Sequence, residues 1–81
     1  PLSFEAENGL AHAFQARYLQ AKRPADLDGA VAHQRRAVSL NRRSWTLWRE
    51  LAEMTLAQDN KSEAARFFAE AQALRPAPPR D

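Results

Sequence analysis

The sequence predicts an all-α protein, and three observations support this. Ala, Leu, Gln, Glu and Arg, which are good helix formers, dominate the 81 residues. Only two Gly occur, and β-branched residues are few. Between the Pro residues, apolar side chains recur at three- and four-residue spacing, which is typical of amphipathic helices and not of strands.

The first two helices are predicted over residues 3–21 and 26–40. Ser3 and Asp26 are the expected N-caps, because a side-chain oxygen can accept from a free N–H of the first turn. Pro24 separates the two segments, since it cannot lie inside a helix without loss of a hydrogen bond. The apolar positions of these segments are Phe4, Leu10, Ala11, Phe14 and Tyr18 in the first, and Ala30, Val31, Ala37, Val38 and Leu40 in the second.

The third and fourth helices are predicted over residues 44–57 and 60–74, with Ser44 and Asn60 as N-caps. Residues 77–81 form a tail too rich in Pro to continue a helix, and we expect it to be extended or disordered. The apolar positions are Trp45, Leu47, Trp48, Leu51, Ala52 and Leu56 in the third helix, and Ala64, Phe67, Phe68, Ala71 and Leu74 in the fourth.

The aromatic residues divide into two predicted groups. Four are expected in the core, namely Phe14, Tyr18, Trp48 and Phe68. Phe4, Trp45 and Phe67 are harder to bury within two stacked pairs of helices. For Phe4 and Phe67 we expect either partial burial or a contact with another molecule or domain, which would allow weak self-association.

The chain contains an internal repeat, with two spacings. In the second and fourth helices, equivalent residues are 34 positions apart, and they are Ala30 with Ala64, Ala37 with Ala71, and Leu40 with Leu74. In the first and third helices they are 41 positions apart, and they are Ser3 with Ser44, Phe4 with Trp45, Leu10 with Leu51, and Ala11 with Ala52. The difference of seven residues is about two helical turns, so the first helix keeps its buried face although it is longer.

The spacing of 34 is the tetratricopeptide period, and residues 45–78 resemble that family closely. Trp48, Leu51 and Ala52 match its W-x-x-L-G/A element, and Pro76 matches its closing proline. Ala64, Phe68 and Ala71 match the A-x-x-x-F-x-x-A element of its second helix. Thr55 departs from the usual Tyr, and the first unit is degenerate, with Gln34 and Arg42 at the aromatic and proline positions.

The resemblance implies two tandem helix-turn-helix units that form a short right-handed α-solenoid of four helices. Residues 1–76 would be one domain, with a first unit over 3–41, whose first helix is lengthened, and a second over 44–76. Pro1 falls where a preceding unit would close, and the chain lacks an initiator Met. We therefore expect a domain of a longer protein, with flanking repeats.

No residue pattern indicates catalysis, a metal site or a cofactor. The chain has no Cys, and His12 and His33 lie on different predicted helices with no carboxylate at ligand spacing, which favours polar surface residues. Glu50 and Glu53 share a helix, but no nucleophile accompanies them. Gly9 and Gly29 are isolated, so no phosphate-binding loop is predicted. Gly29 either costs some stability or permits a close helix contact.

Charge is nearly balanced, at +2, and does not predict nucleic-acid binding. No apolar run approaches the roughly 18 residues that a membrane span requires. Five arginines nevertheless lie close in sequence, namely Arg35, Arg36, Arg42, Arg43 and Arg49. They are interpreted as solvated surface, as a contact for an acidic protein segment, or as a weak site for another anionic partner, in that order.

The resemblance implies a non-enzymatic module that binds a peptide or helix of a partner protein on its concave face. That face is lined by the first helix of each unit, and the side chains expected there are Glu5, Asn8, His12, Gln15, Thr46, Arg49, Glu53 and Leu56. The segment "HQRRAVSLNRRSWTLWRELAEM" is also similar to repeat regions of some bacterial O-antigen ligase-like polymerases. The alternative is therefore a structural appendage of a membrane glycan polymerase. The first interpretation fits the cytoplasm and the second the periplasm.

Overall fold

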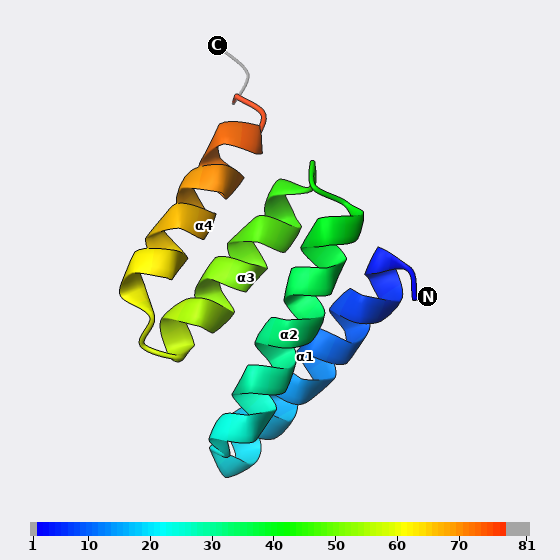
Figure 1. The fold of residues 1–81 in the computed structure, drawn as a ribbon, viewed down its shortest axis with the longest axis vertical. Coiled ribbons are helices and arrows are strands. Elements are labelled where there is room, and N and C mark those ends of the chain that lie inside the picture. The colour runs from blue at the N-terminus through cyan, green and yellow to red at the C-terminus, as the bar shows by residue number, and fades with distance from the viewer. Residues whose placement is uncertain (1, 78–81) are drawn as a thin grey trace.

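The computed structural model describes residues 2–77, and this range is all-α (Figure 1). No strand occurs within it, which confirms the prediction of an all-α fold. Pro1 and residues 78–81 of the predicted tail lie outside the described residues. The helices are α1 (Phe4–Ala21), α2 (Pro24–Leu40), α3 (Trp45–Ala57) and α4 (Lys61–Leu74).

Side-chain caps start three of the four helices, as predicted. The Ser3 hydroxyl accepts from the Ala6 amide at 3.1 Å, and the Ser44 hydroxyl accepts from the Leu47 amide at 3.4 Å. The Asn60 side chain accepts from the Glu63 amide, also at 3.4 Å. Each cap satisfies one of the N–H groups that a helix leaves free in its first turn.

The start of α2 was predicted incorrectly. The helix begins at Pro24, two residues before the expected cap Asp26, and Arg23 precedes it without a side-chain cap. Proline suits the first helical position because its fixed φ matches the helix and its missing N–H would have had no partner there. Asp26 is instead buried in the first turn, 3.7 Å from the Arg17 guanidinium.

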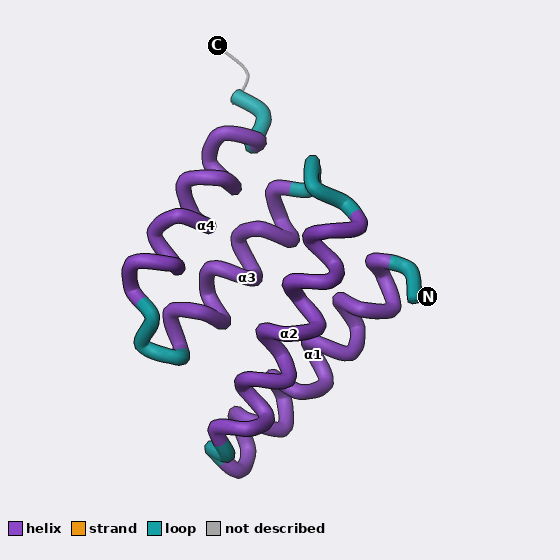
Figure 2. The backbone as a smooth tube through the Cα atoms, in the orientation of Figure 1, coloured by secondary structure: helices purple, strands orange, loops and turns teal. Residues whose placement is uncertain are grey.

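The helices form two antiparallel hairpins, α1 with α2 and α3 with α4, and α2 packs against α3 (Figures 1 and 2). In Figure 1, α3 lies between α2 and α4. Short turns join the helices. Lys22 closes α1 in the left-handed conformation, with φ of 54°, and its amide donates to the Tyr18 carbonyl.

Buried alanines line both hairpins. Ala11, Ala30, Ala37 and Ala52 are fully buried, and Ala64 nearly so. A methyl group at these positions lets helix backbones approach closely, and larger residues fill the space beside them. The remaining buried apolar residues are Leu27, Val31, Val38, Leu47, Leu51, Met54, Phe67 and Ala71.

The structure buries Phe67 and exposes Phe68 of α4. Phe67, for which partial burial or a contact with another molecule or domain was expected, is 7% exposed and lies against Trp48, with ring centroids 5.8 Å apart. Phe68, expected in the core, is 38% exposed. Adjacent helical residues point about 100° apart, so only one of the pair can face the core. Phe4, Phe14 and Trp48 are half-buried and pack against the core, and Tyr18 is also half-buried.

The two glycines have opposite surroundings. A Cβ on Gly29 would lie 2.9 Å from Phe14 Cδ1 and 3.1 Å from its Cγ, so this glycine allows α1 and α2 to meet closely. A Cβ on Gly9 would meet no atom within 4 Å. Only Gly29 therefore has a packing requirement within the chain.

We predict that Gly9→Ala stabilises the fold by about 0.5–1 kcal/mol, because glycine weakens a helix interior by that amount relative to alanine. Gly29→Ala should lose this gain, since the added methyl displaces the Phe14 ring at a cost of about 1–3 kcal/mol. Urea unfolding of both variants measures the difference. Equal stabilities would contradict the packing described for Gly29.

Candidate functional site

A buried amide connects the two hairpins. Gln34 of α2 is fully buried. Its Nε2 donates to the Leu47 carbonyl of α3 at 3.0 Å, and its Oε1 accepts from Asn8 Nδ2 of α1 at 2.9 Å. One side chain thus joins three helices with both of its polar atoms satisfied, as burial of an amide requires.

The network continues to the surface through Glu50 of α3. Asn8 also donates to Glu50 Oε1 at 3.1 Å, and His12 Nε2 lies 2.7 Å from Glu50 Oε2. The tautomer of His12 that is protonated at Nε2 donates this bond, and the doubly protonated ring would form an ion pair. These hydrogen bonds link α1 to α3 next to the buried Gln34 of α2.

The α1–α3 face is the surface made by the eight residues predicted to bind a partner. Asn8 and His12 lie on it but are engaged with Glu50. Arg49 stacks over the Trp45 ring at 5.4 Å, and Thr46 shares a hydrogen bond with the Ser44 hydroxyl. The rest are Glu5, Glu53 and Leu56, which are exposed, and Gln15, which is half-buried.

Both histidines, predicted to be polar surface residues, have carboxylate partners on other helices. His12 is exposed, as predicted. His12 reaches Glu50, as described above. His33 is half-buried, stacks on Phe14 with centroids 5.4 Å apart, and places Nδ1 2.7 Å from Glu7 Oε1. Glu7 is itself buried, so this contact pairs a carboxylate inside the first hairpin.

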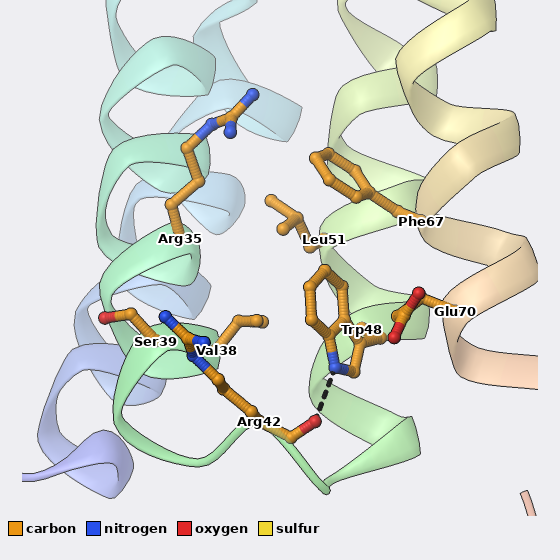
Figure 3. Close-up of a pocket in the computed structure, with 8 residues that line it drawn as sticks. All are labelled: Arg35, Val38, Ser39, Arg42, Trp48, Leu51, Phe67 and Glu70. Atoms are coloured by element: carbon orange, nitrogen blue, oxygen red, sulfur yellow. Dashed lines mark hydrogen bonds between the residues drawn. The ribbon is translucent and has the colours of Figure 1, made fainter. Parts of the chain in front are cut away.

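A cleft that the sequence did not predict lies between α2 and the second hairpin (Figure 3). Its volume is about 430 Å³. Apolar side chains from three helices form the floor, and they are Val38, Leu51, Trp48 and Phe67. Polar side chains form the rim, and they are Arg35, Ser39, Arg42 and Glu70. The Trp48 indole N–H donates to the Arg42 carbonyl at 2.8 Å, which positions the ring at one end of the cleft.

The arginine cluster of the sequence divides between surfaces. Arg35 and Arg42 line the cleft, whereas Arg49 lines a separate hollow beside Trp45 and Phe68. Arg35 is also paired with Glu63 and lies over the Phe67 ring at 5.3 Å. The arginines that lie close in sequence therefore do not form one cationic patch on the surface.

The sequence carried a partial signal for the features that were missed. Gln34 departs from the aromatic expected at its position in the repeat, and a polar residue on a buried face indicates a hydrogen-bonded partner. The partner itself could not be deduced, because Asn8, Leu47 and Glu50 come from other helices. Phe68 was expected in the core from the sequence, whereas Phe67 is buried there and lines the cleft.

Within residues 2–77, no group of three or more His, Cys, Asp or Glu side chains is placed to hold a metal ion. Over the same range, no helix combines the length and apolar character needed to cross a membrane. Comparison of the chain with models of known protein families, with curated proteins and with solved structures finds no match.

The Arg35–Glu63 pair gives a pH-dependent prediction. The hydrogen bond from Arg35 lowers the pKa of Glu63, and a bond from Asn60 acts in the same direction. A carboxyl group with a lowered folded-state pKa stabilises the fold above its unfolded-state pKa, and this contribution is lost as pH falls through the folded-state value. Arg35→Gln should therefore raise the pKa of Glu63 toward its ordinary range in an NMR-monitored titration.

Arg36→Gln is the matched control, because it removes one neighbouring guanidinium that does not pair with Glu63. The pKa of Glu63 should remain lowered in this variant. Identical titration of Glu63 in the two variants would contradict a dominant role for Arg35.

Proposed function

We propose that this chain is a tetratricopeptide-like module that binds a segment of a partner protein. Its two hairpins would be successive units of a short right-handed solenoid. The repeated buried alanines support this, since Ala30 and Ala37 of α2 are equivalent to Ala64 and Ala71 of α4, and all four are buried. Units of this type cannot bury their apolar faces alone, and their stacking creates an extended concave surface for binding.

The partner segment is proposed to lie along the α1–α3 face. The network of Asn8, His12 and Glu50 carries this proposal, because its hydrogen bonds link the first helices of the two hairpins. Exposed groups of both charge signs and an exposed leucine remain available on it, namely Glu5, Arg49, Glu53 and Leu56. A face of this composition suits an extended peptide or a helix that carries mixed charge.

A rigid surface favours this function because binding then requires little ordering of the module itself. The network uses side chains that are half-buried or better, apart from His12. Substitution inside the network should therefore weaken partner binding indirectly, while substitution of Arg49 or Glu53 should weaken it through lost contact.

The cleft of Figure 3 is a second candidate site for a protein partner. Its aromatic floor and charged rim have the composition of a small binding pocket. An anionic segment could pair there with Arg42. Binding of this kind should weaken steeply with added salt, whereas apolar contact should not. The role of structural appendage to a membrane glycan polymerase rests on the resemblance of the sequence alone.

The proposed face can be tested with a phage-displayed random peptide library selected on the purified chain. Peptides that bind the wild-type chain should lose about tenfold or more in affinity for Arg49→Glu and for Glu53→Arg, since each introduces charge repulsion at the face. Arg66→Glu is the matched control, because Arg66 is exposed on α4 and lies outside both proposed sites.

Chemical-shift mapping with a selected peptide would identify the surface directly. Perturbations should cover α1 and α3 and leave the cleft residues of α2 unaffected. Perturbations confined to Arg42, Ser39 and Glu70 would overturn the proposed face and assign binding to the cleft.

A further inference from the structure

Within the chain, α2 packs against α3. The equivalent outer faces of α4 and α1 are exposed among residues 2–77. On α2, Gln34 bonds to α3, and Val38 lines the cleft with Leu51 of α3. Both residues are buried. The equivalent residues of α4, 34 positions on, are Phe68 and Gln72, and both are exposed. The face that α2 uses to receive α3 is therefore uncovered on α4.

The same change in exposure occurs between α3 and α1. On α3, Leu47, Leu51 and Met54 are buried, and Leu47 accepts the bond from α2. The equivalent residues of α1, 41 positions earlier, are Ala6, Leu10 and Ala13, and all three are exposed. Leu10 is 39% exposed where Leu51 is 1% exposed. The face that α3 presents to α2 is thus repeated, uncovered, on α1.

Charges of opposite sign lie at the edges of the two faces, and the exposed Arg17, two turns from Leu10 on α1, lies 3.7 Å from Asp26. Arg49 and Arg75 both stack over Trp45, at 5.4 and 5.2 Å, beside the exposed ring of Phe68. Neither has a carboxylate partner among residues 2–77. At the other end, the first turn of α1 carries the exposed Glu5.

We propose that the end face of one chain, centred on Phe68 of α4, receives the outer face of α1, centred on Leu10, from a second copy. In the junction within the chain, α3 begins where α2 ends. A docked α1 in the same arrangement begins where α4 ends, which places its Glu5 near Arg75 of the first copy. Apolar groups and charges then match in one orientation.

This contact joins unlike surfaces, so one face of each type stays free after two chains associate. Such a heterologous contact extends into open chains unless rotation closes a ring. The inference rests on the repeated-hairpin arrangement of the proposed function, and it does not depend on partner binding at the α1–α3 face.

Complementary blocked variants test the proposal. Leu10→Glu blocks the α1 end and Phe68→Glu blocks the α4 end, and both residues are exposed, so both variants should fold, as far-UV circular dichroism can check. In analytical ultracentrifugation the wild-type chain should associate with rising concentration. Each variant alone should be at least about tenfold weaker in association, while an equimolar mixture should form dimers of about twice the monomer mass and no larger species.

Leu19→Glu is the matched control, because Leu19 is exposed on the opposite side of α1 from Leu10, and it should associate as the wild type does. A wild-type chain that stays monomeric at millimolar concentration would overturn the proposal. Self-association of Leu10→Glu alone would also overturn it, because a symmetric contact through Phe68 would be the cause. Phe68 lines a hollow with Arg49 of the α1–α3 face, so Leu10→Glu is the variant that separates this inference from the proposed function. It should lose self-association and retain peptide binding.

Discussion

The placement of one hairpin on the other depends on the buried amide of Gln34. An amide removed from water must find partners for both its donor and its acceptor, and a group left unsatisfied costs about 1–3 kcal/mol. Gln34 finds its acceptor on the backbone of α3 and its donor on Asn8 of α1. The bond from Asn8 lies within the first hairpin and fixes the amide, whereas the bond to Leu47 joins the two hairpins. Apolar contacts between helices are not directional, so the bond to Leu47 favours one placement of the second hairpin over others that would bury similar area.

Small residues determine how closely the helices approach once that arrangement is selected. Ala11 and Ala30 are fully buried in the first hairpin, as is Ala52 in the second, and Gly29 accepts the ring of Phe14. The junction between hairpins uses larger groups, including Leu51, Val38 and Trp48, and leaves a cleft where they do not fill the space. The hairpins are therefore tight units, and the boundary between them carries both the polar network and the cleft.

Local features were the most predictable from the sequence. Ser3, Ser44 and Asn60 begin their helices because capping depends only on residues within one turn. The failures occurred where local patterns allow two answers. Residues 64, 67 and 71 have three- and four-residue spacing, and so do residues 64, 68 and 71, so periodicity could not choose between Phe67 and Phe68. Asp26 and Pro24 both mark a helix start, and only the path of the chain distinguishes them. The partners of Gln34 and of the two histidines come from other helices, and no spacing within one helix reveals them.

Two kinds of surface are available for binding, the α1–α3 face and the end faces around Leu10 and Phe68. Asn8 and His12 bond to Glu50, so on the α1–α3 face the exposed charged side chains are the ones available to a partner. The end faces around Leu10 and Phe68 are apolar copies of a junction that the chain already makes once. Binding of a partner segment and addition of another unit would therefore use different apolar side chains, while Glu5 and Arg49 lie at the border of both surfaces.

A double-mutant cycle between Asn8→Ala and Gln34→Ala tests the central role of the buried amide most directly. Each single variant, the double variant and the wild type would be unfolded in urea, and the coupling free energy taken from the four stabilities. If Asn8 satisfies the buried amide and so holds Gln34 in place to reach Leu47, the two sites should be coupled by about 1 kcal/mol. Additive effects within about 0.3 kcal/mol would contradict it, because Asn8 and Gln34 would then act independently.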